Sequence, residues 1–146
     1  ETLVRRAIQL SADAVAHGNH PFGALLAHGD QILIEAENTI FTAHDVTNHA
    51  ETNLVRLAVQ QYEPEFLATC TLYTSTEPCA MCSGAIYWSG IGAVVYACSS
   101  NRLAEIAGEH LALTCRDVFA KGVRPVHVDG PILEAEAAAV HLRYWR

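Results

Sequence analysis

The stretch that decides the fold reads TEPCAMCSGAIYWSG and spans residues 76–90 of a chain of 146 residues. Cys79 and Cys82 stand three positions apart, and Pro78 precedes the first of them. Proline is tolerated in the first turn of a helix, and the residues that follow are mostly apolar, so we expect a buried helix over residues 80–88. Residues three apart share a helix face, and a helix N-terminus favours thiolates. Both sulfurs can therefore hold one divalent metal ion at this point.

A third ligand type occurs upstream in the tripeptide His49-Ala50-Glu51. Three protein ligands drawn from His and Cys fit a catalytic zinc, which keeps a fourth position for water. Glu51 lies two positions after His49, so on a helix it points to a different face from the ligand and can stand beside that water. We therefore expect one zinc ion per chain, held by His49, Cys79 and Cys82, with Glu51 as the catalytic residue.

Two other interpretations of the cysteine pair have to be weighed. A redox pair usually lies at the end of a strand in a thioredoxin-like unit, and a four-cysteine structural zinc site needs a second C-x-x-C, which the sequence lacks. The joint pattern of His, Glu, Pro and two Cys favours the catalytic zinc. A structural zinc is the remaining alternative.

The composition indicates a single domain over residues 1–146, because the length is ordinary for a domain and 51% of the residues are hydrophobic. No run of about 18 apolar residues occurs, so we expect no membrane span. The first helical stretch carries Arg5, Arg6 and Asp13, so we expect no signal peptide. These features favour a cytoplasmic protein without disulfides. Three of its five cysteines are then expected to be small core residues: Cys70, Cys98 and Cys115.

The charge pattern argues against a nucleic-acid partner. The net charge is −7, and Lys121 is the only lysine among nine basic residues. Proteins that hold a nucleic-acid backbone usually show clustered Lys and Arg, and this chain does not.

The hydrophobic pattern predicts alternating strands and helices. A hairpin of strands 22–27 and 31–36 follows a first helix, a polar loop covers residues 37–48, and the last two strands are expected to be parallel. In the second helix we expect Leu54, Val55, Leu57, Ala58 and Val59 to face inward. The fold class is α/β, with a three-layer α/β/α arrangement and a central mixed five-stranded sheet with helices on both faces. The predicted helices are 3–16, 48–60, 80–88, 101–120 in two pieces, and 132–144; the other strands are 69–75, 93–97 (expected to be central) and 125–128.

These motifs together resemble the cytidine deaminase superfamily, whose zinc signature is H-x-E…P-C-x-x-C. The resemblance covers about residues 3–107 and is nearest to the branch of bacterial guanine deaminases and tRNA adenosine deaminases. Guanine deaminases carry a similar Tyr-Trp pair at Tyr87 and Trp88, where tRNA adenosine deaminases tend to have His-Ser. The landmarks of the resemblance are Pro21 to Ala24, Asn38, His49 to Glu51, Glu77 to Cys82 and Gly84 to Trp88.

The resemblance implies a zinc-dependent hydrolytic deaminase of a free nucleobase or related aminated heterocycle, with a guanine-type purine as the first candidate. Hydroxide on the zinc would attack the carbon that bears the amine, Glu51 would shuttle the proton, and ammonia would leave. The resemblance also implies a homodimer and base contacts from Asn38, Phe22 and Trp88. The alternatives are that Asn38 bonds its own loop and that the two rings are core residues.

The resemblance fails in one place. Guanine deaminases have a Gly-Phe-Asp type segment where this chain reads Ala-Gly-Glu-His-Leu over residues 107–111. Glu109 is a candidate replacement for the missing acid, and a cytosine-type pyrimidine remains an alternative substrate. A tRNA-specific adenosine deaminase is disfavoured by the lone lysine. A zinc-stabilised scaffold without activity is disfavoured by the presence of Glu51.

The C-terminal segment ends in Arg143, Tyr144, Trp145 and Arg146. Burial of two large aromatic rings is strongly favourable, so they are expected either to pack on the domain or to cover something. In guanine deaminases this segment caps the pocket, in some cases that of the neighbouring subunit. Capping of the active site and simple docking on the sheet are both kept as expectations.

Overall fold

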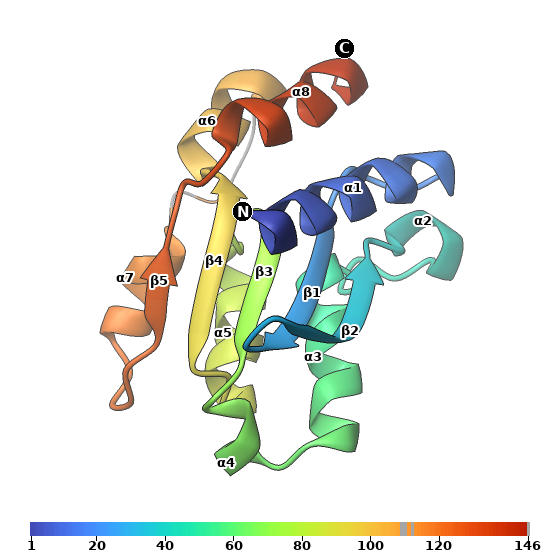
Figure 1. Ribbon diagram of the computed structural model, residues 1–146. Helices are drawn as coiled ribbons and strands as arrows, with labels where there is room; N and C mark the ends of the chain where they lie inside the picture. Colours follow the sequence, from blue (N-terminus) through green and yellow to red (C-terminus); the bar gives the residue numbers. More distant parts are fainter. Residues whose placement is uncertain (109–110, 112, 146) are drawn as a thin grey trace.

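The computed structural model describes residues 1–108, 111 and 113–145. A hairpin of two strands is followed by three further strands that are separated by helices (Figure 1). In chain order the elements are α1 (Thr2–Ala16), β1 (Gly23–His28), β2 (Gln31–Glu37), α2 (Ile40–Ala43), α3 (Ala50–Gln61), α4 (Pro64–Leu67), β3 (Thr71–Thr76), α5 (Ala80–Ser89), β4 (Ala93–Cys98), α6 (Ser100–Ala107), α7 (Cys115–Ala120), β5 (His127–Asp129) and α8 (Glu134–Tyr144).

The strands form one mixed sheet in the order β2-β1-β3-β4-β5. β1 pairs antiparallel with both β2 and β3, whereas β3, β4 and β5 run parallel. The expected hairpin and the expected parallel pairing of the last two strands are both confirmed. β4 has a neighbour on each side, which accounts for its continuously apolar sequence.

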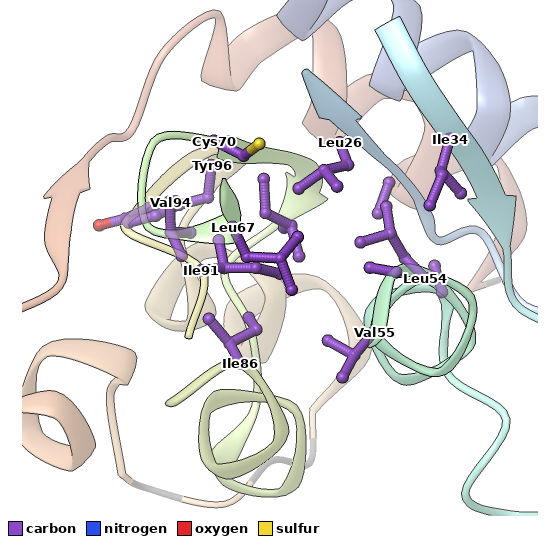
Figure 2. Packing of buried hydrophobic residues seen from close by; sticks show 14 of the residues in the cluster. Leu26, Ile34, Leu54, Val55, Leu67, Cys70, Ile86, Ile91, Val94 and Tyr96 are labelled. Atoms are coloured by element: carbon purple, nitrogen blue, oxygen red, sulfur yellow. The ribbon is translucent and has the colours of Figure 1, made fainter. Parts of the chain in front are cut away.

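Helices cover both faces of the sheet, so the predicted three-layer α/β/α arrangement is confirmed (Figure 1). On one face, α1 and α8 pack through Val4, Ile8 and Val140 against the end of β4. On the other face, the larger core joins the sheet to α3 and α5, and Figure 2 shows Leu26, Leu54 and Ile86 converging there. None of the described helices is long and apolar enough to cross a lipid bilayer.

Helix α1 lies directly against the start of β1. A Cβ atom added to Gly23 would come within 2.5 Å of the backbone nitrogen of Ser11 and 2.7 Å of the carbonyl oxygen of Ala7. Only glycine fits so close an approach. The contact fixes where the chain enters β1, and therefore where the preceding residue, Phe22, is held.

The structure corrects the sequence analysis in three places. The expected polar loop over residues 37–48 contains the short helix α2, and α4 is a further four-residue helix that was not expected. In α3 the side chains of Leu57 and Val59 are exposed rather than inward, because the helix turns only one face to the sheet. Leu54, Val55 and Ala58 are buried as expected.

Candidate active site

The three predicted metal ligands come together at the N-termini of two neighbouring helices. His49 is the N-cap residue of α3 and Cys79 is the N-cap residue of α5, while Cys82 is buried in the first turn of α5. The Nδ1 atom of His49 lies 3.6 Å from the Sγ atom of Cys79 and 3.4 Å from the Sγ atom of Cys82. Among the described residues these three form the one group with metal-binding geometry. We call it the metal side of the site.

The spacing of these atoms fits zinc. Zn–S bonds of about 2.3 Å and Zn–N bonds of about 2.0 Å at tetrahedral angles place S and N atoms about 3.5 Å apart. The two N–S distances above agree with that value. Two thiolates and one imidazole leave a fourth position for water. The donor set therefore fits a catalytic zinc ion.

The two thiols differ in acidity because one donates to the other. The pKa of Cys79 is lowered to about 4, chiefly by a hydrogen bond from Cys82 and then, against burial, by one from His49. The same hydrogen bond, together with burial, raises the pKa of Cys82. A proton thus lies between the two sulfur atoms. Zinc binding would displace this proton, since both sulfurs must be deprotonated to bind zinc.

Glu51 lies in the first turn of α3 and is only 4% exposed. Burial, followed by the charge of Cys79, raises the pKa of Glu51 to about 7, although the charge of His49 and then hydrogen bonds from the backbone and from Thr74 oppose the rise. A carboxyl group with a pKa near neutrality can both accept and donate a proton under working conditions.

A cavity of about 180 Å³ opens beside Glu51 and the metal side. Its lining combines two carboxylates, two small hydroxyl residues and several apolar side chains, and contains no Lys or Arg among the described residues. The lining residues are Phe22, His49, Glu51, Thr76, Glu77, Cys79, Ser100, Leu103, Leu111 and Leu113.

Glu77 is a lining residue whose role was not foreseen. It is buried, and its carboxylate accepts hydrogen bonds from the backbone N–H groups of Ser100 and Cys115 at 3.0 and 3.1 Å. Glu77 therefore ties the turn before Cys79 to the first residues of α6 and α7. An acidic residue directly before Pro-Cys was visible in the sequence, but its two partners, 23 and 38 positions away, were not.

The three expected base contacts are placed differently from one another. Phe22 lines the cavity. Asn38 is buried, and its side-chain oxygen accepts from the backbone N–H of Ile40 at 3.1 Å, so at least that atom serves its own loop. The structure does not bring Trp88 to the cavity, because it lies at the other end of α5 from Cys79 and is 84% exposed. An apolar helix sequence alone could not separate its inner face from its outer face.

The C-terminal residues pack around His20, close to Phe22. The Tyr144 hydroxyl lies 3.0 Å from Nδ1 of His20, and the Trp145 ring stacks on the His20 ring with centroids 5.0 Å apart. The His20 ring also lies edge-on to Phe22, at 6.5 Å. Burial, and then the charge of His49, lowers the pKa of His20. We call the following four residues the tail side of the site: His20, His141, Tyr144 and Trp145.

The candidate acid Glu109 lies outside the described residues. On either side of it the chain contributes Leu103, Leu111 and Leu113 to the cavity lining. Of the described residues in the segment that departs from the guanine deaminase pattern, Leu111 lines the cavity.

Comparisons with known proteins agree with this geometry. The family model of the cytidine and deoxycytidylate deaminase zinc-binding region matches residues 1–98. A Schizosaccharomyces pombe protein named "Probable cytosine deaminase" is 40% identical over 148 residues, which cover 97% of this chain and 90% of the relative. The guanine deaminase of Bacillus subtilis is 42% identical over 106 residues, which cover 72% of this chain and 68% of that enzyme.

Solved structures show the same fold. A guanine deaminase from Nitrosomonas europaea superposes with a TM-score of 0.84 at 24% identity, over 97% of this chain and 82% of that one. The guanine deaminase of Bacillus subtilis superposes with a TM-score of 0.67 at 31% identity, over 99% of this chain and 94% of that one. Since the family match includes His49, Glu51, Cys79 and Cys82, this chain belongs to the cytidine and deoxycytidylate deaminase family and is a zinc-dependent hydrolytic deaminase.

Proposed function

We propose that this deaminase acts on a free nucleobase, with guanine or a related purine as the first candidate. The observation that carries the proposal is the lining of the cavity, which is small, largely apolar and without Lys or Arg among the described residues. Such a lining suits a flat uncharged heterocycle better than a phosphate-bearing substrate. The similarity to the guanine deaminase of Bacillus subtilis and the Tyr87–Trp88 pair support the choice of a purine.

Cytosine is the second candidate. The relative named as a cytosine deaminase is similar over 97% of this chain, whereas the sequence similarity to the Bacillus subtilis enzyme covers 72%. The departure from the guanine deaminase pattern at residues 107–111 also favours a different base.

The reaction replaces an exocyclic amine by an oxygen from water and releases ammonia. Zinc, when bound by His49, Cys79 and Cys82, lowers the pKa of water so that a nucleophile is available near neutral pH. Glu51 accepts the proton that the water loses and passes it to a ring nitrogen of the base. It then takes the remaining proton from the hydroxyl group that the carbon has gained and donates it to the departing amine, so that the carbon–nitrogen bond breaks as the carbonyl forms. The buried position and near-neutral pKa of Glu51 suit both directions of transfer.

The apolar lining has its own part in the reaction. Phe22 and Leu103 offer flat and aliphatic surfaces on which a planar base can be held. They also exclude water other than the reacting molecule, which strengthens electrostatic interactions with Glu51.

A homodimer is part of the proposal. Met81, Gly84 and Trp88 follow one another at helical spacing along the outer side of α5, and Met81 and Trp88 are exposed. A Cβ atom added to Gly84 would meet nothing within 4 Å, so a second helix could approach closely there. Light scattering should give twice the chain mass of 15.8 kDa, and Trp88→Glu should shift the protein towards the monomer. A wild-type monomer at micromolar concentration would refute this part of the proposal.

The decisive experiment is ammonia release from guanine, cytosine, adenine, their nucleosides and a short RNA hairpin that contains adenosine. Release from a free base, and not from the RNA, supports the proposal. The matched control is Glu51→Gln, which should keep zinc and fold but lose turnover. Turnover of the RNA alone would instead make the chain a tRNA-type adenosine deaminase.

A further inference from the structure

His141 is a buried histidine of α8 with two hydrogen-bond partners, and the reaction described above does not use it. It is 1% exposed. Its Nδ1 atom lies 3.0 Å from Nε1 of Trp145, and its Nε2 atom lies 2.7 Å from Oγ1 of Thr76. The Phe22 ring packs against it at 5.3 Å between centroids. His141 thus connects the tail side to two residues that line the cavity, Phe22 and Thr76.

The direction of each hydrogen bond follows from the donors available. The indole nitrogen of Trp145 carries a hydrogen and can only donate, so Nδ1 of His141 accepts. The ring is neutral at neutral pH, because burial lowers the pKa of His141 to about 4. Its single N–H must therefore be on Nε2, which donates to the hydroxyl oxygen of Thr76.

This arrangement leaves the hydroxyl hydrogen of Thr76 available. Among the described residues, His141 is the only hydrogen-bond partner of Oγ1 of Thr76, and there the oxygen accepts. Thr76 is 2% exposed and lines the cavity at the end of β3, three residues before Cys79. A buried hydroxyl that has a donor to spare needs an acceptor, since an unmade buried hydrogen bond is costly.

We propose that Thr76 is a substrate-binding residue that donates a hydrogen bond to an acceptor of the base, a ring nitrogen or an exocyclic carbonyl oxygen, and that His141 and Trp145 fix its direction. The proposal rests on the proposed function, in that the ligand is a free heterocyclic base. The chain of donors runs from the indole through the imidazole to the hydroxyl, and each bond in such a chain polarises the next. Thr76 is then a specificity residue, and His141 is a positioning residue that acts through it.

The test compares Thr76→Val, which has the same shape but no hydroxyl, with Thr76→Ser, which keeps the hydroxyl. Binding is measured by calorimetry on zinc-loaded protein in a Glu51→Gln background, so that the base is not consumed. The probe is the base that the wild type deaminates, together with analogues of it in which one carbonyl is replaced by hydrogen or one ring nitrogen by CH. Thr76→Val should raise the Kd about 2- to 10-fold relative to Thr76→Ser, as expected for one neutral hydrogen bond.

The analogues distinguish a hydrogen bond to the base from a purely structural role of Thr76, because a structural role would change the Kd of every analogue alike. The two variants should bind with equal Kd the analogue that lacks the acceptor atom of this hydrogen bond. For the other analogues the difference in Kd between the variants should persist. Equal binding of the parent base by both variants, or the same ratio for every analogue, overturns the proposal. If Thr76→Val does not fold, because the N–H of His141 loses its acceptor, Thr76→Ala leaves room for a water and should show the same selective loss.

Failure of the proposed function has a different signature. If the wild type neither binds nor deaminates any of the free bases, both the proposed function and the role of Thr76 are wrong. If the wild type deaminates a free base but the two variants bind it alike, only the role of Thr76 is wrong.

Discussion

The metal side of the site lines the cavity directly, whereas the tail side contacts it through Phe22 and Thr76, and the two sides are assembled from the chain in different ways. The metal side comes from two short motifs, each at the first residues of a helix, and the packing of α3 beside α5 brings His49 to Cys79, 30 positions away. The tail side joins residues up to 124 positions apart, through ring contacts and single hydrogen bonds. The comparison separates the groups that can hold the metal ion and move protons from a cluster that supports two residues of the cavity lining, Phe22 and Thr76.

The largest effect is expected from breaking the metal side. Cys79→Ala should lose zinc and, with it, all measurable turnover, because a ligand set of one thiolate and one imidazole binds the ion much more weakly. Metal analysis by mass spectrometry and a thermal melt are the measurements. Cys70→Ala is the matched control, since Cys70 is a buried cysteine that is not one of the three grouped ligands. Full zinc occupancy in Cys79→Ala would show that the ligand assignment is wrong.

A smaller but still large effect is expected at Glu51. Glu51→Gln keeps the shape of the side chain but cannot shuttle protons, so kcat should fall about 10²- to 10⁴-fold while zinc content is unchanged. Steady-state ammonia release and metal analysis measure the two quantities. A kcat equal to that of the wild type would remove Glu51 from the mechanism.

Removal of the tail side should have an intermediate effect. We expect it to lower kcat/KM and to leave the zinc content unchanged. Deletion of residues 143–146 removes the contacts of Tyr144 and Trp145 with His20 and His141. If the tail closes the site, kcat/KM should fall about 10-fold or more while the zinc content and melting temperature change little. A lower melting temperature with unchanged kcat/KM would mean that the tail only packs.

The smallest effect is a pH dependence of stability that His141 should cause. Its pKa is lowered from 6.5 in the unfolded chain to about 4 in the folded protein, so between these values the unfolded state binds more protons. Stability should therefore fall as the pH drops from about 6.5 to about 4, by up to about 3 kcal/mol.

Urea titrations of the wild type and His141→Gln at several pH values measure this dependence. The variant should lack the His141 component. His20, which faces the same cluster and also has a lowered pKa, should contribute equally to both proteins. Parallel curves for the two proteins would contradict the assignment to His141.

The sequence predicts the metal side of the site better than it predicts the tail side. The order of strands and helices and the two motifs, H-x-E and P-C-x-x-C, can be seen in short stretches of sequence. The predictions of the fold and of zinc as cofactor are confirmed, and the structure brings His49, Cys79 and Cys82 together, while the role of Glu51 stays a prediction. The helices α2 and α4, of four residues each, are too short to give a periodic signal. The misplaced side chains, Leu57, Val59 and Trp88, are apolar residues on exposed helix faces, and an apolar residue does not by itself reveal which face is buried.

The contacts that sequence reasoning missed are tertiary. His141 appeared only as part of an expected helix, and nothing in its neighbourhood along the chain pointed to Thr76, 65 positions away. Glu77 was visible as a landmark, but its role depends on two helix starts that come together only in the fold. Residues within a recognisable motif were predicted, whereas partners that lie outside any motif were not.

The position of His49 on α3 and of both cysteines on α5 has a consequence for dynamics. A zinc ion at this point would link the starts of the two helices through metal–ligand bonds and so close a loop of about 30 residues in the chain. Local opening of either helix start then requires the ion to be released. Amide hydrogen exchange in the first turns of α3 and α5 should accordingly slow on metal binding, while exchange in α1 and α8, which pack on the opposite face of the sheet, should change little.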